Sequence, residues 1–305
     1  MLGSIIGVGV FNLPASLAPY GPISLVALGL TTVGAVALAL LFASLASRMP
    51  ADGGPYAYAR AGFGNLVGFV SAWLYWLSAW AGNAAIATGW VLYVEHFMNT
   101  GHNVVFTIML TLASIWLAAG INLLEISSMG RVQLWTSILK YISLLFVSVV
   151  GLAFVEPANF ATWNLSGRSV ALVVVISGFG ALNGWTMLSA EMPKAAAQDG
   201  LFPARFDRLS RRGVPIFGIL VSGVLASVLV LVSYIGEAGI TVFNTLILMN
   251  GIAAAIPYAF SGLAQIKWRI ADRRAISTSR FVRDVSVAVL SVIFFSVVRC
   301  LLKRH

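Results

Sequence analysis

Residues 1–21 read MLGSIIGVGVFNLPASLAPYG, an apolar run with Gly7 and Gly9 in its middle and Pro14 five residues later. Glycine and proline are the residues that a helix interior tolerates least. One interpretation is a GxxxG face of Gly3 and Gly7, which is common where membrane helices touch. The other is a helix broken at Gly7-Val8-Gly9, where freed amides would bind an anionic group such as a carboxylate. The residues of this stretch alone leave both interpretations open.

The composition indicates a membrane protein. The 305 residues are 59% hydrophobic and 10% charged, with a mean hydropathy of +0.93, whereas soluble domains carry roughly a quarter charged residues. Apolar runs of about 20 residues, long enough to cross a bilayer, recur along the chain. We therefore predict an all-α polytopic protein that forms one membrane domain over residues 1–305. A signal peptide is disfavoured, because no Lys or Arg precedes Arg48. The predicted full spans are 22–47, 66–95, 103–124, 132–155, 169–192, 214–234, 240–266 and 284–301, after a shorter apolar piece at 2–17.

The net charge of +9 is distributed as a topology signal. If residue 1 is cytoplasmic, the loops 48–65, 125–131, 193–213 and 267–283 lie inside and hold 14 of the 19 Lys and Arg residues. We therefore expect a plasma-membrane protein with a cytoplasmic N-terminus and no nucleic-acid partner. The basic tail falls on the outer side by this alternation, so either the last segment does not cross the membrane or the chain stops where a further span is expected.

Several motifs resemble one known family, the amino acid–polyamine–organocation permeases. IIGVGVFNLPASLA at 5–18, GGPYAYARAGFG at 53–64 and LYWLSAWAGN at 74–83 resemble its first three spans. GWTMLSAEMPKAAAQDGLFPARF at 184–206 and IPYAFSGLAQ at 256–265 resemble its eighth and tenth spans. The sequence is most similar to basic amino acid and polyamine antiporters of the arginine/agmatine and arginine/ornithine types.

The resemblance implies an incomplete version of the family's five-plus-five inverted-repeat fold. ATWNLSG at 161–167 resembles the loop after the family's fifth span, yet it runs directly into a segment that resembles the eighth. The sixth and seventh spans are therefore expected to be missing, as are the first half-span and the last span. Removal of two spans preserves the inside–outside alternation of the loops.

The resemblance also implies where substrate binds. In the family, the first span breaks at its GxG, and backbone groups there hold the amino and carboxylate ends of the substrate. In this sequence the corresponding residues are Ile5, Gly7, Val8 and Gly9. Val8 stands where some exchangers carry serine, so the substrate contacts need not be the same in detail.

Four further residues are candidates for the side-chain end of the substrate. Asn83, with Ser78 on the same face, matches a third-span asparagine near the substrate in those exchangers. A buried asparagine can equally hydrogen-bond a neighbouring helix. Trp185 matches a pocket tryptophan that would form a cation–π contact with a guanidinium, although packing at a lipid interface also explains it. Asn250 is a weaker candidate in the segment that resembles the tenth span.

Two charged residues are candidates for coupling. Lys140 lies about nine residues into its span, near mid-membrane at 1.5 Å per residue. A cation there is costly and indicates function; the resemblance implies proton coupling or a fixed charge beside the first span. Snorkelling to an interface is the alternative. Glu191 could attract a cationic substrate or a proton, or it could stabilise local structure beside Lys194.

The leading hypothesis is an amino acid permease for a basic amino acid or polyamine that works by exchange or proton coupling. A transport-incompetent protein derived from a permease, or an interaction subunit, is the alternative, because the sixth span supplies half of the family's site. An enzyme is not expected, since the sequence has no HExxH motif, no paired intramembrane Asp residues and no Ser/His arrangement at depth. With Cys300 as the single cysteine, no metal or cofactor is expected. The expected partners are the small-molecule substrate and the lipid bilayer, and association into a homo-oligomer is left open.

Overall fold

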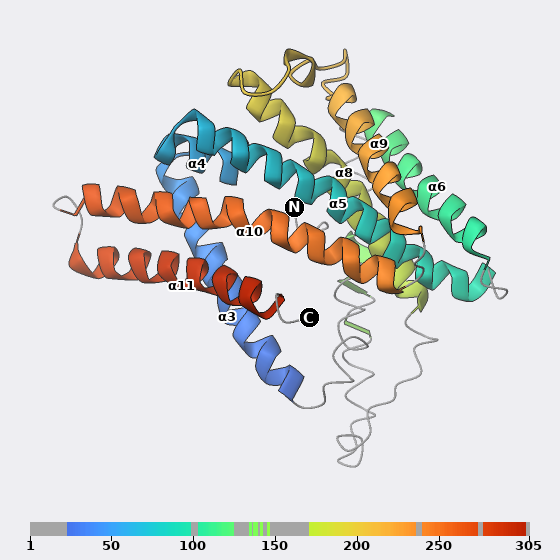
Figure 1. Cartoon of the computed structure of the whole chain (residues 1–305), viewed down its shortest axis with the longest axis horizontal. Coiled ribbons are helices and arrows are strands. Elements are labelled where there is room, and N and C mark those ends of the chain that lie inside the picture. Colours follow the sequence, from blue (N-terminus) through green and yellow to red (C-terminus); the bar gives the residue numbers. More distant parts are fainter. Residues whose placement is uncertain are drawn as a thin grey trace. The chain divides into compact units, whose positions relative to one another are not determined.

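The computed structural model describes residues 23–98, 103–124, 171–235, 240–273 and 277–302, with short helical pieces between 134 and 146. Within these ranges the regular elements are helices, and no strand occurs among them (Figure 1). The elements are α3 (Ile23–Arg48), α4 (Pro55–Phe63), α5 (Asn65–Met98), α6 (Val104–Leu124), α8 (Ala171–Gln198), the 3-10 turn η3 (Ala204–Phe206), α9 (Ile216–Ser233), α10 (Ile240–Ala271) and α11 (Thr278–Leu302).

The prediction of an all-α polytopic membrane protein is confirmed. Each predicted span except 132–155 coincides with a long helix, and that segment lies mostly outside the described residues, as does the apolar piece at 2–17. Among the described helices, three are long and apolar enough to cross a membrane: Val104–Leu123, Ile216–Ser233 and Thr241–Ala271. Thr32–Arg48 is a shorter apolar helix. The number of eight spans stays a prediction.

The chain divides into two compact units. The described part of the first unit comes from residues 79–190 and 208–248, and that of the second from residues 25–78, 191–207 and 249–302. Helices α5, α8 and α10 therefore each contribute one part to either unit. The single membrane domain stays a prediction.

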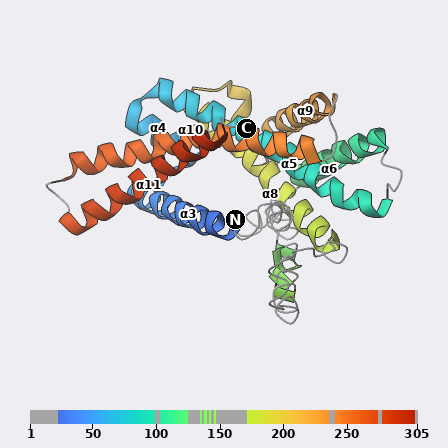
Figure 2. The ribbon, with the colours of Figure 1, turned by 60° about the horizontal axis from the view of Figure 1, so that its bottom comes forward.

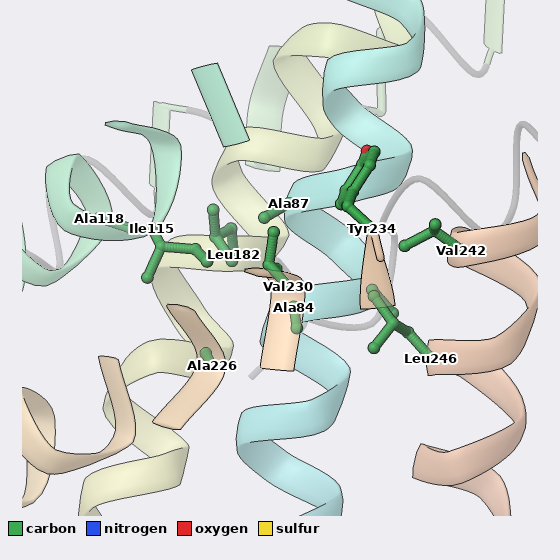
Figure 3. Packing of buried hydrophobic residues seen from close by; sticks show 11 residues of the cluster. Ala84, Ala87, Ile115, Ala118, Leu182, Ala226, Val230, Tyr234, Val242 and Leu246 are labelled. Atoms are coloured by element: carbon green, nitrogen blue, oxygen red, sulfur yellow. The ribbon is translucent and has the colours of Figure 1, made fainter. Parts of the chain in front are cut away.

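The first unit packs the later half of α5 with α6, α9 and the earlier part of α8. Its core interleaves alanines from the helices with larger aliphatic side chains and Tyr234 (Figure 3). Small residues let helix backbones approach closely, which is how helices associate in a bilayer. At Gly218 of α9 a Cβ atom would lie 3.1 Å from Cα of Ala190 on α8. The close approach of α8 and α9 therefore requires a glycine at position 218.

The second unit contains α3, α4, α11 and most of α10. In both ribbon views α10 and α11 run side by side (Figures 1 and 2). A core of Leu41 and Leu45 on α3, Tyr58 on α4 and Ala288 on α11 joins these elements. Close approach again requires glycine, because a Cβ atom at Gly262 would lie 2.9 Å from Cγ2 of Val292.

Helix α4 is a nine-residue helix whose limits follow from its sequence. Pro55 at its first turn lacks the N–H that would be unpaired there anyway. Gly53 precedes it with φ of 90°, and Gly64 ends it with φ of 88°, a region that L side chains rarely adopt. A Cβ atom at Gly53 would also lie 3.1 Å from that of Ala195. The start of α4 is thereby held against the end of α8.

Candidate functional site

A buried polar cluster joins α5, α8 and α9 in the first unit. Asn83 of α5 donates from Nδ2 to Oγ of Ser189 on α8 at 3.5 Å. Ser189 in turn donates from Oγ to the carbonyl of Thr186 at 2.7 Å, and Ser222 of α9 donates from Oγ to the carbonyl of Ser189 at 3.2 Å. Asn83, Ser189 and Ser222 are 4%, 0% and 1% exposed. Ser189 is therefore the point at which the three helices share hydrogen bonds.

The bond from Ser222 has a specific cause. Pro193 lies inside α8, four residues after Ser189. Proline has no backbone N–H, so it leaves the carbonyl of the residue four positions earlier without its helical partner. That carbonyl belongs to Ser189, and Ser222 supplies the missing donor. The serine on α9 thus allows α8 to continue through Pro193 to Gln198.

Asn83 retains an unused acceptor. Its Oδ1 atom is buried and has no hydrogen-bond partner among the described residues. A buried polar atom without a partner costs about 1–3 kcal/mol, so such an atom in a folded protein requires an explanation. Trp185 lies on α8 one turn before Ser189, on the same helix face and half-buried. The free oxygen can accept a hydrogen bond from an N–H donor such as an ammonium or guanidinium group.

The other predicted site residues with described side chains lie in the second unit. Ser78 is buried, and its Oγ donates to the carbonyl of Tyr75 in its own helix at 2.7 Å. Asn250 is half-buried on α10. Glu191 Oε2 forms an ion pair with Lys194 Nζ at 3.2 Å, and the Glu191 side chain is 41% exposed. This contact is the one expected if Glu191 stabilises local structure beside Lys194. The roles of all three stay predictions.

Five predicted residues lie outside the described part of the chain. They are Ile5, Gly7, Val8, Gly9 and Lys140. The substrate-end role of the first four and the coupling role of Lys140 therefore stay predictions.

A second polar cluster lies outside the predicted spans, between α4 and the turn that follows α8. The hydroxyl of Tyr56 donates to Asp199 Oδ2 at 2.6 Å, and Arg60 forms an ion pair with Asp199 Oδ1. Arg60 also donates from Nε to Oδ1 of Asn65 at 3.1 Å. Tyr56 and Arg60 lie four residues apart on one face of α4, so the helix presents both donors to the same carboxylate.

This cluster changes the proton affinities of its members. Burial, and then the hydrogen bond to Asp199, raise the pKa of the Tyr56 hydroxyl above its usual range. Partial burial opposes ionisation of Asp199, yet the hydrogen bonds from Tyr56 and Arg60 outweigh it and lower the pKa of that carboxyl. Asp199 is therefore a carboxylate at neutral pH.

Two further ion pairs join elements of the second unit. Arg48 at the end of α3 pairs with Asp272 after α10, where both side chains are about one-third exposed. Arg269 of α10 pairs with Asp284 of α11 at 2.8 Å, and these side chains are only 12% and 5% exposed. Arg269 also donates to Oγ of Ser44 on α3 at 3.1 Å. The predicted loops 48–65, 193–213 and 267–283 are thus in contact through charged residues.

Sequence reasoning named Asn83 and Trp185 but missed Ser189, Tyr56 and Asp199. Ser189 could have been found from its position, four residues after Trp185 and four before Pro193. Tyr56 and Asp199 stand inside the motifs GGPYAYARAGFG and AQDGLF, but no local signal pairs residues 143 positions apart. Only the folded chain brings them together.

Comparison with protein families identifies two matches that together cover residues 1–302. An amino acid permease family profile matches residues 1–169. A second profile, also of amino acid permeases, matches residues 153–302.

The individual relatives are named as antiporters or transporters of amino acids or polyamines. The chain is 26% identical to the arginine/ornithine antiporter of Pseudomonas aeruginosa over 365 aligned positions, covering 86% of this chain and 75% of the relative. It is 28% identical to the cadaverine/lysine antiporter of Escherichia coli, over 72% of this chain and 48% of the relative. It is 22% identical to a putrescine transporter of Haemophilus influenzae, over 85% of this chain and 80% of the relative.

Proposed function

Because this chain belongs to the amino acid permease family, we propose that it exchanges basic amino acids or polyamines across the plasma membrane. It is a multi-pass membrane protein and a transporter of that family, not an enzyme. The mechanism is alternating access around a site near the middle of the bilayer.

The substrate class rests on the relatives together with one structural observation. Relatives named for arginine, ornithine, lysine, cadaverine and putrescine share a cationic substrate. The observation is the buried Oδ1 of Asn83, which accepts no hydrogen bond from the described residues. A guanidinium or ammonium group donates hydrogen bonds and accepts none. Such a group would satisfy the free oxygen of Asn83 and so would bind there in preference to a neutral apolar side chain.

The remaining roles follow from this placement. Trp185, on the face of α8 that carries Ser189, would stack on the cation of the substrate. The backbone at Ile5–Gly9 would hold the amino and carboxylate ends of an amino acid. Lys140 would couple transport to a proton or brace the first span, and Glu191 would attract the cation from the cytoplasmic side.

The contacts of the second unit support the proposed orientation. The Arg60–Asp199 and Arg48–Asp272 pairs join three loops that alternation assigns to one side of the membrane. These loops hold most of the basic residues of the chain. Basic loops stay on the cytoplasmic side, so we place the N-terminus and the loops 193–213 and 267–283 there.

Counterflow in proteoliposomes tests the proposal. Vesicles loaded with arginine, ornithine or agmatine are offered labelled arginine, and the chain should accumulate label only where the interior holds a basic substrate. Asn83→Ala should reduce the initial rate at low substrate by about tenfold, because a hydrogen bond to a charged group is lost. Ser114→Ala is the matched control, since Ser114 is also buried in the first unit and its Oγ donates to the carbonyl of Thr111 within α6 at 2.8 Å. Equal rates for the two variants, or label uptake into vesicles loaded with leucine, would contradict the proposal.

A second candidate is a permease-derived protein that does not transport. The alignment with the Pseudomonas relative runs over 365 positions but includes only 86% of this 305-residue chain, so that relative has segments without a counterpart here. The two family profiles overlap at residues 153–169, where the sixth and seventh spans are expected to be missing. If the folded chain fails in counterflow, insertion of two such spans after Gly167 should restore label uptake. Failure of the extended chain as well would count against both candidates.

A further inference from the structure

The second unit contains a cavity of about 540 Å³ that the site near Asn83 does not include. Every residue that lines it belongs to the predicted cytoplasmic loops 48–65 and 193–213. Its polar groups are Asp52, Arg60, Asn65, Gln198 and Asp199. Cavities of roughly 300–1,000 Å³ hold small-molecule ligands, so this one has room for an amino acid or a diamine.

The charges of the cavity are unequal. Asp199 and Arg60 form an ion pair and offset one another. Asp52 is exposed in the turn before α4 and has no hydrogen bond or ion pair with the described residues. The cavity therefore has a net negative charge, which attracts a cation.

The contacts of Arg60 are a model for how this cavity would bind the guanidinium group of a ligand. The side chain of Arg60 enters it and lies between the carboxylate of Asp199 and the amide oxygen of Asn65. Tyr56 fixes the orientation of Asp199 through its hydrogen bond of 2.6 Å. A carboxylate has about four lone-pair positions, and Asp199 remains 38% exposed beside Arg60. It can therefore accept a second cationic donor from a ligand.

The rest of the wall is apolar. Met49, Ala57 and Ala195 line the cavity beside the charged groups. A ligand with a short alkyl chain and a cationic end would place its methylene groups against these side chains and its charge near the carboxylates.

We propose that this cavity is a second cation-binding site, in which Asp52 and Asp199 bind the guanidinium or ammonium end of a basic amino acid or polyamine on the cytoplasmic loops of the chain. The choice of ligand rests on the proposed function, whereas the site itself rests on the cavity and its charges. Arg60 competes with the ligand for Asp199, so the affinity is weak and the ligand is released readily. The site concentrates the cationic substrate at the cytoplasmic loops of the chain.

Equilibrium binding of labelled agmatine to the full chain in lipid nanodiscs tests this inference. Asp52→Asn should weaken one class of sites by about fivefold, as expected for loss of one partly exposed charge. The substitution should not disturb the fold, because asparagine also suits this turn and Asp52 has no partner to lose among the described residues. Arg60→Gln should strengthen binding at the same sites by about threefold, since Asp199 is then free. Asp207→Asn is the matched control, because Asp207 is exposed on the loop 193–213 that also carries Asp199, and it does not line the cavity.

The variants separate the two proposals. Binding that falls in Asp52→Asn but not in Asn83→Ala supports the cavity even if transport fails. Binding that falls only in Asn83→Ala supports the proposed function and overturns the cavity site. Superimposable isotherms for Asp52→Asn, Asp207→Asn and the unaltered chain overturn the inference, and so does the absence of agmatine binding.

Discussion

Tyr56 and Asp199, 143 positions apart, are joined by a hydrogen bond of 2.6 Å from the Tyr56 hydroxyl to Asp199 Oδ2. The tyrosine is fully buried and stands on α4, whereas the aspartate follows α8. One donor therefore links two loops that the chain separates by several helices, and it also orients the carboxylate of the cavity.

Removal of that donor should loosen the link. Tyr56→Phe should lower the free energy of unfolding by about 1 kcal/mol, the usual contribution of one hydrogen bond. Thermal unfolding in detergent measures the effect. Tyr58→Phe is the control, because Tyr58 is equally buried on α4 but its hydroxyl makes no hydrogen bond with the described residues. A loss of the same size in both variants would show that the hydroxyl of Tyr56 contributes nothing specific.

The same carboxylate predicts a pH dependence. The pKa of Asp199 is lowered below the unfolded value of 3.8. The ionised Asp199 therefore stabilises the folded protein fully above pH 3.8. This stabilisation is lost as the pH falls through the lower pKa that Asp199 has in the folded state. The difference in midpoint temperature between the unaltered chain and Asp199→Asn should be constant from pH 7 to about 5 and should shrink below about pH 4. A difference in midpoint temperature that grows towards acid pH would contradict a lowered pKa of Asp199.

Ser222 should be needed for α8 to pass Pro193. Ser222→Ala leaves the carbonyl of Ser189 buried without a donor, which should destabilise the protein by about 1–3 kcal/mol. Ser227→Ala on the same helix is the control, since Ser227 donates only to the carbonyl of Gly223 in α9 at 2.8 Å. Denaturant unfolding of the two variants measures the difference. Equal stability would mean that the carbonyl of Ser189 does not depend on Ser222.

The ion pairs Arg269–Asp284 and Arg48–Asp272 of the second unit should contribute very differently to stability. Asp284→Asn leaves Arg269 charged in a setting where only 12% of its side chain is exposed. Removal of one partner from a buried pair costs about 3–5 kcal/mol. Asp272→Asn should change stability far less, because Arg48 and Asp272 are about one-third exposed. Chemical unfolding of both variants checks the order, and a larger loss in Asp272→Asn would contradict it.

Much of the helical fold could be predicted from apolar run length. The predicted spans 103–124 and 214–234 agree with α6 and α9 to within a few residues, since each is a long apolar stretch with polar or turn-forming neighbours. The prediction for α8 ended at residue 192, before Pro193, but the helix continues to Gln198. The reason is a donor on α9, which no local pattern of α8 contains.

The candidate site was predictable only in part. Asn83 was identified by its motif, and its environment on α8 followed only from the fold. Asp52, Asp199 and Arg60 lie in loops whose charges indicated only the topology. The sequence did not indicate that these three residues line one cavity. Ion pairs and cavities depend on long-range contacts that periodicity and composition do not specify.

Recognition of a cation is the central claim, and one comparison tests it most directly. Arginine and citrulline have nearly the same shape, but citrulline carries a neutral urea group in place of the guanidinium. The measurement is the initial rate of labelled arginine counterflow into vesicles loaded with one or the other at equal concentration. We predict that arginine-loaded vesicles exchange about fivefold faster, because a hydrogen bond from a charged donor contributes about 1 kcal/mol more than one from a neutral donor such as the urea group. Equal rates from the two interiors would contradict it.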